Sequence, residues 1–78
     1  MAIWTKPEEV YPECEAGDCV VIIVMERDGQ FARPRPRLVI LEATEDGWDS
    51  IDPLYSGYTP ADGERWIHEK KLFADAGY

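Results

Sequence analysis

The chain has few of the residues that build a metal or catalytic site. It contains two cysteines, Cys14 and Cys19, and one histidine, His68. Their spacing fits no zinc pattern, so we expect neither a metal site nor a cofactor. The longest apolar run, residues 19–25, is far shorter than the roughly 20 residues that span a bilayer. This excludes a transmembrane helix.

We expect no leader segment at the start of the sequence. Residues 1–6 have neither a basic start nor a long apolar stretch. We therefore expect a cytoplasmic protein whose two cysteines stay reduced. Cys19 opens an apolar run and is expected to be a small core residue.

Basic residues are scarce. The chain has sixteen Asp and Glu residues but only eight Lys and Arg residues, which gives a net charge of −8. The acids gather in two stretches without any Lys or Arg, residues 7–26 and 38–64. This charge disfavours non-specific binding to DNA, RNA or an anionic membrane. It favours either plain solubility or docking to a basic partner.

The apolar residues of this short chain predict a β fold. We expect 78 residues to form one domain, residues 1–78, close to the lower limit for a self-supporting core. Residues 19–26 and 37–44 are rich in β-branched side chains, which favour strands. A strand that is apolar at every position must be covered on both faces. The predicted fold is therefore all-β, with a sheet of about five strands curled into a small barrel.

Two turns set the expected strand pairing. A tight hairpin at residues 27–30 would pair Val21 with Pro36 and spoil the ladder, so we favour a longer loop, 27 to about 35. Pro34 and Pro36 then remove N–H donors along a single strand edge. Asp46-Gly47 predicts a second hairpin between strands 38–44 and 48–51.

The two ends of the chain are less clear. Residues 2–5 are expected to form a short first strand. For the C-terminus we favour a strand at residues 65–68 followed by one helical turn that packs Leu72 and Phe73. The alternative is a single helix, residues 60–76, which would give an α+β fold. Tyr55 and Tyr58 lie in a Pro- and Gly-rich segment and are expected to be exposed or half-buried.

Two motifs resemble the opening of PemK-like toxins, which are small SH3-like barrels that cleave RNA. They are Gly17-Asp18-Cys19-Val20-Val21-Ile22 and Arg35-Pro36-Arg37-Leu38-Val39-Ile40. Residues 66–72 also look like the last strand and helical turn of many SH3-like barrels. The resemblance implies an SH3-like barrel and, as one alternative function, RNA cleavage by Arg35. The family also uses a Ser or Thr on the following strand, which neither Thr44 nor Ser50 clearly matches.

The function that we favour is binding without catalysis. A small, acidic, aromatic-rich chain is typical of phage and mobile-element inhibitors, including anti-CRISPR proteins and nucleic-acid mimics. Such a protein would dock on a basic host complex that handles nucleic acid. Trp48 or Tyr55 would serve as an apolar anchor. The candidate acidic contacts surround the predicted second hairpin: Glu42, Glu45, Asp46, Asp49 and Asp52.

A basic segment suggests a further alternative. Arg33, Arg35 and Arg37 alternate with prolines, so an extended backbone places all three guanidinium groups on one face. This arginine stripe could bind phosphate or an acidic peptide, as in a regulatory module. It could equally neutralise the acid-rich loops of the same chain.

Overall fold

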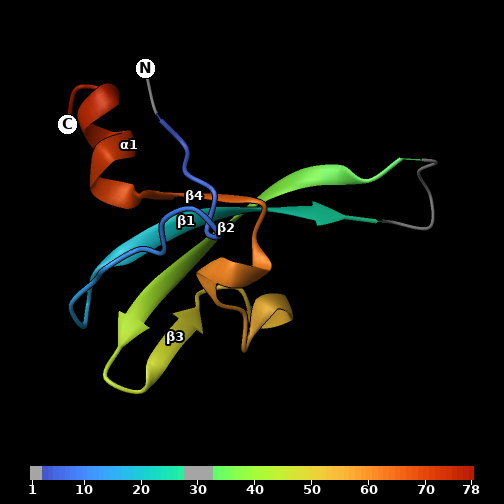
Figure 1. Cartoon of the computed structure of the whole chain (residues 1–78), viewed down its shortest axis with the longest axis horizontal. Coiled ribbons are helices and arrows are strands. Elements are labelled where there is room, and N and C mark those ends of the chain that lie inside the picture. The colour runs from blue at the N-terminus through green and yellow to red at the C-terminus, as the bar shows by residue number, and fades with distance from the viewer. Residues whose placement is uncertain (1–2, 28–32) are drawn as a thin grey trace.

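A four-stranded antiparallel sheet forms the centre of the computed structural model, which describes residues 3–27 and 33–78 (Figure 1). Its strands lie in the order β3-β2-β1-β4. Two short 3-10 turns, η1 (Pro53–Tyr55) and η2 (Pro60–Asp62), connect β3 to β4, and a helix, α1 (Glu69–Asp75), follows β4. The strands are β1 (Cys19–Glu26), β2 (Arg35–Thr44), β3 (Gly47–Ser50) and β4 (Arg65–His68).

The C-terminal segment folds as a strand and a helix, and the single helix over residues 60–76 is wrong. The helix is longer than the one expected turn, and the expected packing of Phe73 is also wrong, because its side chain is 51% exposed. The chain is held against β1 just before β4, where the Glu64 N–H donates to the Ile23 carbonyl at 2.7 Å. Gly63 permits this approach, because a Cβ there would lie 2.8 Å from the Cβ of Ile22. β4 therefore pairs along β1, with Ile22 opposite Trp66.

The expected first strand is reduced to one bridge in the described residues. The N–H of Thr5 donates to the Trp66 carbonyl, and the N–H of Trp66 donates to the Thr5 carbonyl, both at 2.9 Å. Ala2 lies outside the described residues. The N-terminal segment thus continues the sheet beyond β4 at a single residue.

The register of β1 and β2 confirms the longer loop. Val21 lies opposite Ile40, and Met25 lies opposite Pro36. The strand begins at Arg35, two residues before the expected start at Arg37. The Asp28-Gly29 turn signal lies outside the described residues.

Pro36, the proline within β2, lies with its backbone nitrogen on the outer edge of the strand, as the alternation predicted, whereas Pro34 precedes the strand. The Ala43 N–H donates toward β1, to the Asp18 carbonyl, whereas the Ile40 carbonyl accepts from Ile51 on the opposite side. Because backbone groups alternate along a strand, Pro36 shares the outward side with Ile40. The missing N–H of Pro36 therefore belongs to an unpaired edge, where it discourages pairing with another chain.

The second hairpin also forms where it was predicted. Thr44 lies opposite Gly47, so Glu45 and Asp46 make the two-residue turn. Gly47 takes a positive φ of 144°, a conformation that side chains rarely adopt. β3 starts at this glycine, one residue before the expected start.

The two faces of the sheet are buried to different extents. We call inner face the one that carries the main core: Val20, Ile22, Val24, Val39, Leu41, Tyr55 and Trp66. On the other, outer face, Val21 and Ile67 are buried where α1 contacts β1 and β4. The same face leaves Leu38 61% exposed and Met25 46% exposed. The expectation that both apolar runs are covered on both faces is therefore wrong at these two positions.

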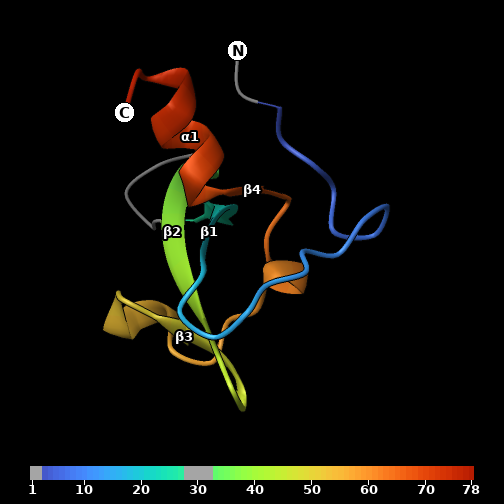
Figure 2. The same ribbon diagram turned by 90° about the vertical axis from the view of Figure 1, so that its left-hand side faces the viewer.

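Helix α1 begins after His68, opposite Val20, whereas Met25 and Leu38 lie toward the other end of the β1–β2 pair. Helix α1 and strand β3 lie at opposite ends of the molecule in both views (Figures 1 and 2). A seven-residue helix at one end can cover only the strands next to it. In the described part of the chain, no helix has the length and apolar character needed to cross a membrane.

Candidate interaction surface

Four of the five predicted acidic contacts gather on the second hairpin. Glu42 of β2 and Asp49 of β3 lie directly opposite each other on the outer face, and both are exposed. Glu45 and Asp46 form the exposed turn. None of these four carboxylates has a cationic partner among residues 3–27 and 33–78. We call this group the acidic hairpin: Glu42, Glu45, Asp46 and Asp49.

The negative field of the acidic hairpin reaches the start of β1. Cys19 lies opposite Glu42 in the sheet. The pKa of its thiol is raised, first by partial burial and then by the negative charges of Glu69, Glu42 and Asp18. The charge of Glu42 therefore acts on the neighbouring strand β1.

Asp52 stands apart from the acidic hairpin. One of its carboxylate oxygens accepts from the Leu54 N–H at 3.0 Å and caps η1. The other forms an ion pair with Arg37, 2.9 Å from the nearest guanidinium nitrogen. The structure therefore commits Asp52 to contacts within the chain.

Arg37 is also committed to contacts within the chain. Its guanidinium lies 3.1 Å from the Glu26 carboxylate and 5.4 Å from the centre of the Tyr55 ring. The hydrogen bond to Glu26 is the main cause that raises the pKa of Arg37 further above its usual range. Of the two interpretations of the arginine stripe, internal neutralisation describes Arg37. Arg33 and Arg35 are exposed at the start of β2.

Neither predicted anchor presents its ring on the outer face. Tyr55 is 7% exposed, so the expectation of an exposed or half-buried side chain is wrong. Its phenol donates a hydrogen bond to Glu26, and its ring packs edge-on against Tyr58 at 5.0 Å. Trp48 lies opposite Ala43 and packs half-buried against the inner core. Both side chains turn toward the core, and the local sequence does not reveal this direction.

A row of apolar side chains next to the acidic hairpin was not predicted from the sequence. Alternate positions of β1 and β2 place them on the outer face, and Ile51 joins them because its N–H donates to the Ile40 carbonyl at 3.3 Å. The signal was present in the same two apolar runs, but we read it as two-sided burial. We call this row the outer apolar strip: Ile23, Met25, Pro36, Leu38, Ile40 and Ile51.

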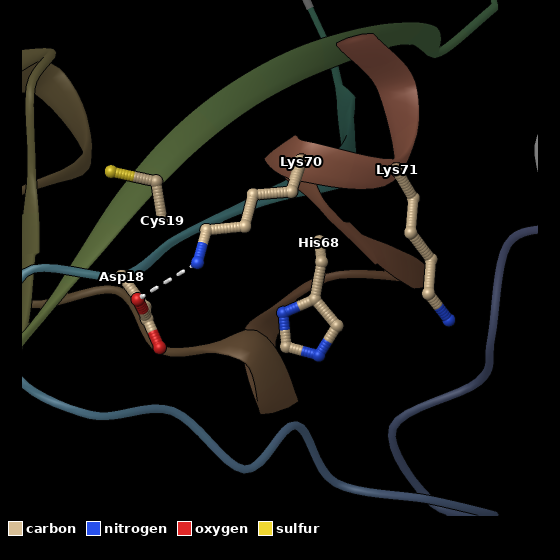
Figure 3. Close-up of a pocket in the computed structure, with 5 residues that line it drawn as sticks. All are labelled: Asp18, Cys19, His68, Lys70 and Lys71. Carbon is tan, nitrogen blue, oxygen red and sulfur yellow. Dashed lines mark ion pairs between the residues drawn. The ribbon is translucent and has the colours of Figure 1, made fainter. Parts of the chain in front are cut away.

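A separate pocket of about 280 Å³ lies between the start of β1 and the start of α1 (Figure 3). The Lys70 side chain reaches toward Asp18, 3.8 Å away, whereas Lys71 points away from it (Figure 3). The residues that line the pocket are Asp18, Cys19, His68, Lys70 and Lys71. The described residues contain no group of three or more His, Cys, Asp or Glu side chains that could hold a metal ion.

Cys14, whose thiol lies next to the pocket residue His68, is poorly suited to nucleophilic attack. The sulfur of Cys14 lies 3.8 Å from Nδ1 of His68, which superficially resembles a cysteine–histidine pair. Burial is the main cause that raises the pKa of Cys14, and the charge of Asp18 raises it further. A nucleophilic cysteine requires the opposite shift.

The residues suggested by the PemK-like resemblance lie apart. Arg35 and Thr44 are the first and last residues of β2, so about 30 Å separates them at ~3.3 Å per residue. Ser50 lies opposite Leu41, also well along the strand from Arg35. The structure brings neither hydroxyl to Arg35.

Comparisons with models of known protein families, with curated proteins and with solved structures find no match. The resemblance to PemK-like toxins is therefore carried by the two short motifs alone.

Proposed function

We propose that this protein is a non-enzymatic binding protein that docks through its acidic hairpin onto a basic protein surface. The observation that carries the proposal is the pairing of Glu42 with Asp49, two exposed carboxylates directly opposite each other in adjacent strands. Like charges at such a position destabilise a sheet. An arrangement that costs stability without an internal benefit suggests that the benefit comes from a partner.

The contrast with other acids of the chain supports this proposal. Glu26 and Asp52 share Arg37, and Asp18 faces Lys70. The acidic hairpin has no such neutralisation within the described residues. A basic surface would supply the missing positive charge and would speed the encounter.

The partner class that we propose is a basic complex that handles nucleic acid. Carboxylates on two paired strands and their turn form a fixed array of negative charge, which can occupy a groove that otherwise binds phosphates. Together with the small size and the net charge of −8, this favours an inhibitor of the anti-CRISPR or nucleic-acid-mimic type, encoded by a phage or mobile element. Such an inhibitor would act in the cytoplasm.

We further propose that the sheet closes as a small SH3-like barrel. The bridge at Thr5 extends the sheet past β4, and the main core cluster lies on the inner face of the long strands β1 and β2. A curled sheet would explain how so short a chain seals that face. The acidic hairpin would then project from one rim of the barrel.

Charge reversal with capture of the partner tests the proposed function. The wild-type protein and the Glu45→Lys/Asp46→Lys/Asp49→Lys variant are coupled to beads and exposed to extract of the native host at low and high salt. The proposal expects a basic, nucleic-acid-binding protein on the wild-type beads at low salt and its loss with the variant. A control variant, Glu8→Lys/Glu9→Lys, reverses exposed charges elsewhere and should retain capture. A partner held equally by all three proteins, at any salt concentration, would contradict the proposal.

A further inference from the structure

The outer apolar strip forms one connected surface across three segments. Pro36 faces Met25 and Leu38 faces Ile23 across β1 and β2. Beyond them, Ile51 lies beside Ile40 across the other edge of β2. Directly opposite residues of adjacent strands have Cβ atoms about 5 Å apart, so these side chains are neighbours along the row.

Much of the outer apolar strip is exposed. Ile51 is 70% exposed and Leu38 is 61% exposed, while Ile23 and Ile40 are half-buried at its centre. Single exposed apolar residues are ordinary, but a contiguous patch with a polar border marks an interaction site. Helix α1 begins after His68, which lies opposite Val20 near the start of β1, whereas Met25 and Pro36 lie at the other end of the β1–β2 pair.

The acidic hairpin borders the same strip. Glu42 is two residues from Ile40 along β2, and Asp49 is two residues from Ile51. Residues two apart in a strand share a face, so the Glu42–Asp49 pair directly continues the Ile40–Ile51 pair. An apolar centre with a charged border is the general anatomy of a protein interface.

We infer that the outer apolar strip and the acidic hairpin form a single docking surface, and that its occupant is a protein segment whose apolar side chains are flanked by Lys or Arg. This inference rests on the proposed function and adds the apolar anchor that Trp48 and Tyr55 do not provide. Leu38 lies in the middle of the strip, between Pro36 and Ile40, and is its principal anchor. The acidic hairpin selects a basic partner, and the strip supplies the apolar contact area.

Charge complementarity favours this occupant over a second copy of the chain. A second copy carries the same unpaired carboxylates and the same net charge of −8. Two acidic hairpins brought to one interface would repel each other, whereas Lys or Arg residues would neutralise them.

Short defined peptides test the inference. The probes are a peptide of alternating leucine and lysine, one of alternating serine and lysine, and one of alternating leucine and glutamate, each titrated into labelled protein. The leucine–lysine peptide should bind at least about tenfold more tightly than either of the others, because only it offers both the apolar and the basic groups. Equal binding of the serine–lysine peptide would overturn the role of the strip.

Paired variants locate the binding. Leu38→Ser should weaken binding of the leucine–lysine peptide about tenfold, whereas Leu54→Ser should leave it nearly unchanged. Leu54 is the matched control because it is 76% exposed and lies in η1, outside the strip. Both side chains are mainly exposed, so both variants should fold, which circular dichroism checks. Equal effects of the two substitutions would contradict the inference.

The remaining outcomes separate this inference from the proposed function. If Glu42→Lys/Asp49→Lys abolishes binding but Leu38→Ser does not, the acidic hairpin binds alone and the inference is wrong. If neither variant changes binding, both proposals are wrong. If sedimentation shows that the wild-type protein self-associates and Leu38→Ser does not, a second copy is the occupant and the inference is overturned.

Discussion

At Tyr55, one phenol group links the inner core to a cluster of charges. Its ring is buried in the core, while its hydroxyl donates to the Glu26 carboxylate that also binds Arg37. Sequence reasoning placed Tyr55 in a loop as an exposed or half-buried side chain, because residues 53–63 contain prolines and glycines. Asp52 supplies the missing local reason, since it caps η1 and turns the chain so that Tyr55 points inward.

The Tyr55→Phe variant should lower the stability of the protein in a pH-dependent manner. The hydrogen bond to Glu26 is the main cause that raises the pKa of Tyr55, followed by burial and the charge of Glu26. A raised folded-state pKa means that the contribution to stability is complete below the ordinary tyrosine value of about 10 and is lost as the pH rises through the folded-state value. We expect a Tm roughly 4–8 °C lower at neutral pH.

Thermal and urea unfolding at several pH values check this prediction. The difference between wild type and Tyr55→Phe should be constant from neutral pH to about pH 10 and should shrink above it. A difference that keeps the same size at higher pH would show that the phenol does not exchange its proton as described.

The Asp18→Asn variant should make both thiols react faster. The charge of Asp18 is among the causes that raise the pKa of both Cys14 and Cys19, after burial. Because only the thiolate reacts, we expect alkylation of Cys14 near pH 8 to accelerate roughly twofold or more. Mass spectrometry of the alkylated peptides measures each rate. The control Asp46→Asn should change neither rate, and unchanged rates in Asp18→Asn would contradict the electrostatic account.

At the scale of the elements, sequence reasoning predicted the strands better than their faces. The β-branched run predicted β1, and the prolines excluded the tight register, because a proline cannot donate within a central ladder. Both inferences depend on backbone chemistry that is local in sequence. Confirmed elements include the second hairpin and the strand and helix at the C-terminus.

The coverage of each face could not be derived in the same way. An apolar residue in a strand reads the same whether its face is sealed, as at Val21, or open, as at Leu38. The difference depends on where α1 comes to rest, which tertiary packing decides. The acidic hairpin was found from sequence because its carboxylates cluster locally, whereas its apolar border was missed because it joins segments far apart in the chain.

The edge position of Pro36 gives a prediction about aggregation. Pro36→Thr restores an N–H donor on the outer edge of β2, and threonine favours strands. The variant should be about as stable as the wild type but should associate at lower protein concentration, because edge pairing becomes possible. Light scattering across a concentration series measures this effect. Pro53→Thr, an exposed proline outside the sheet, is the control and should scatter like the wild type. Equal scattering of all three proteins would contradict the role of the edge.

At the scale of the whole molecule, the two faces of one sheet have separate roles. The main core lies on the inner face, where Tyr55 and Trp48 pack. The outer face carries the acidic hairpin, which has no cationic partner among residues 3–27 and 33–78, and the exposed apolar strip. This division explains how so small a chain combines a net charge of −8 with large exposed apolar side chains.

Mapping of the docking surface by NMR tests this division most directly. On titration with the peptide of alternating leucine and lysine, the account predicts the largest amide shifts on the outer face, at Leu38, Ile40, Glu42, Asp49 and Ile51. The amide signals of Leu54 and Phe73, which are exposed elsewhere, should barely shift. Shifts concentrated on α1 or at the pocket beside His68, with the outer face of β2 unchanged, would contradict the account.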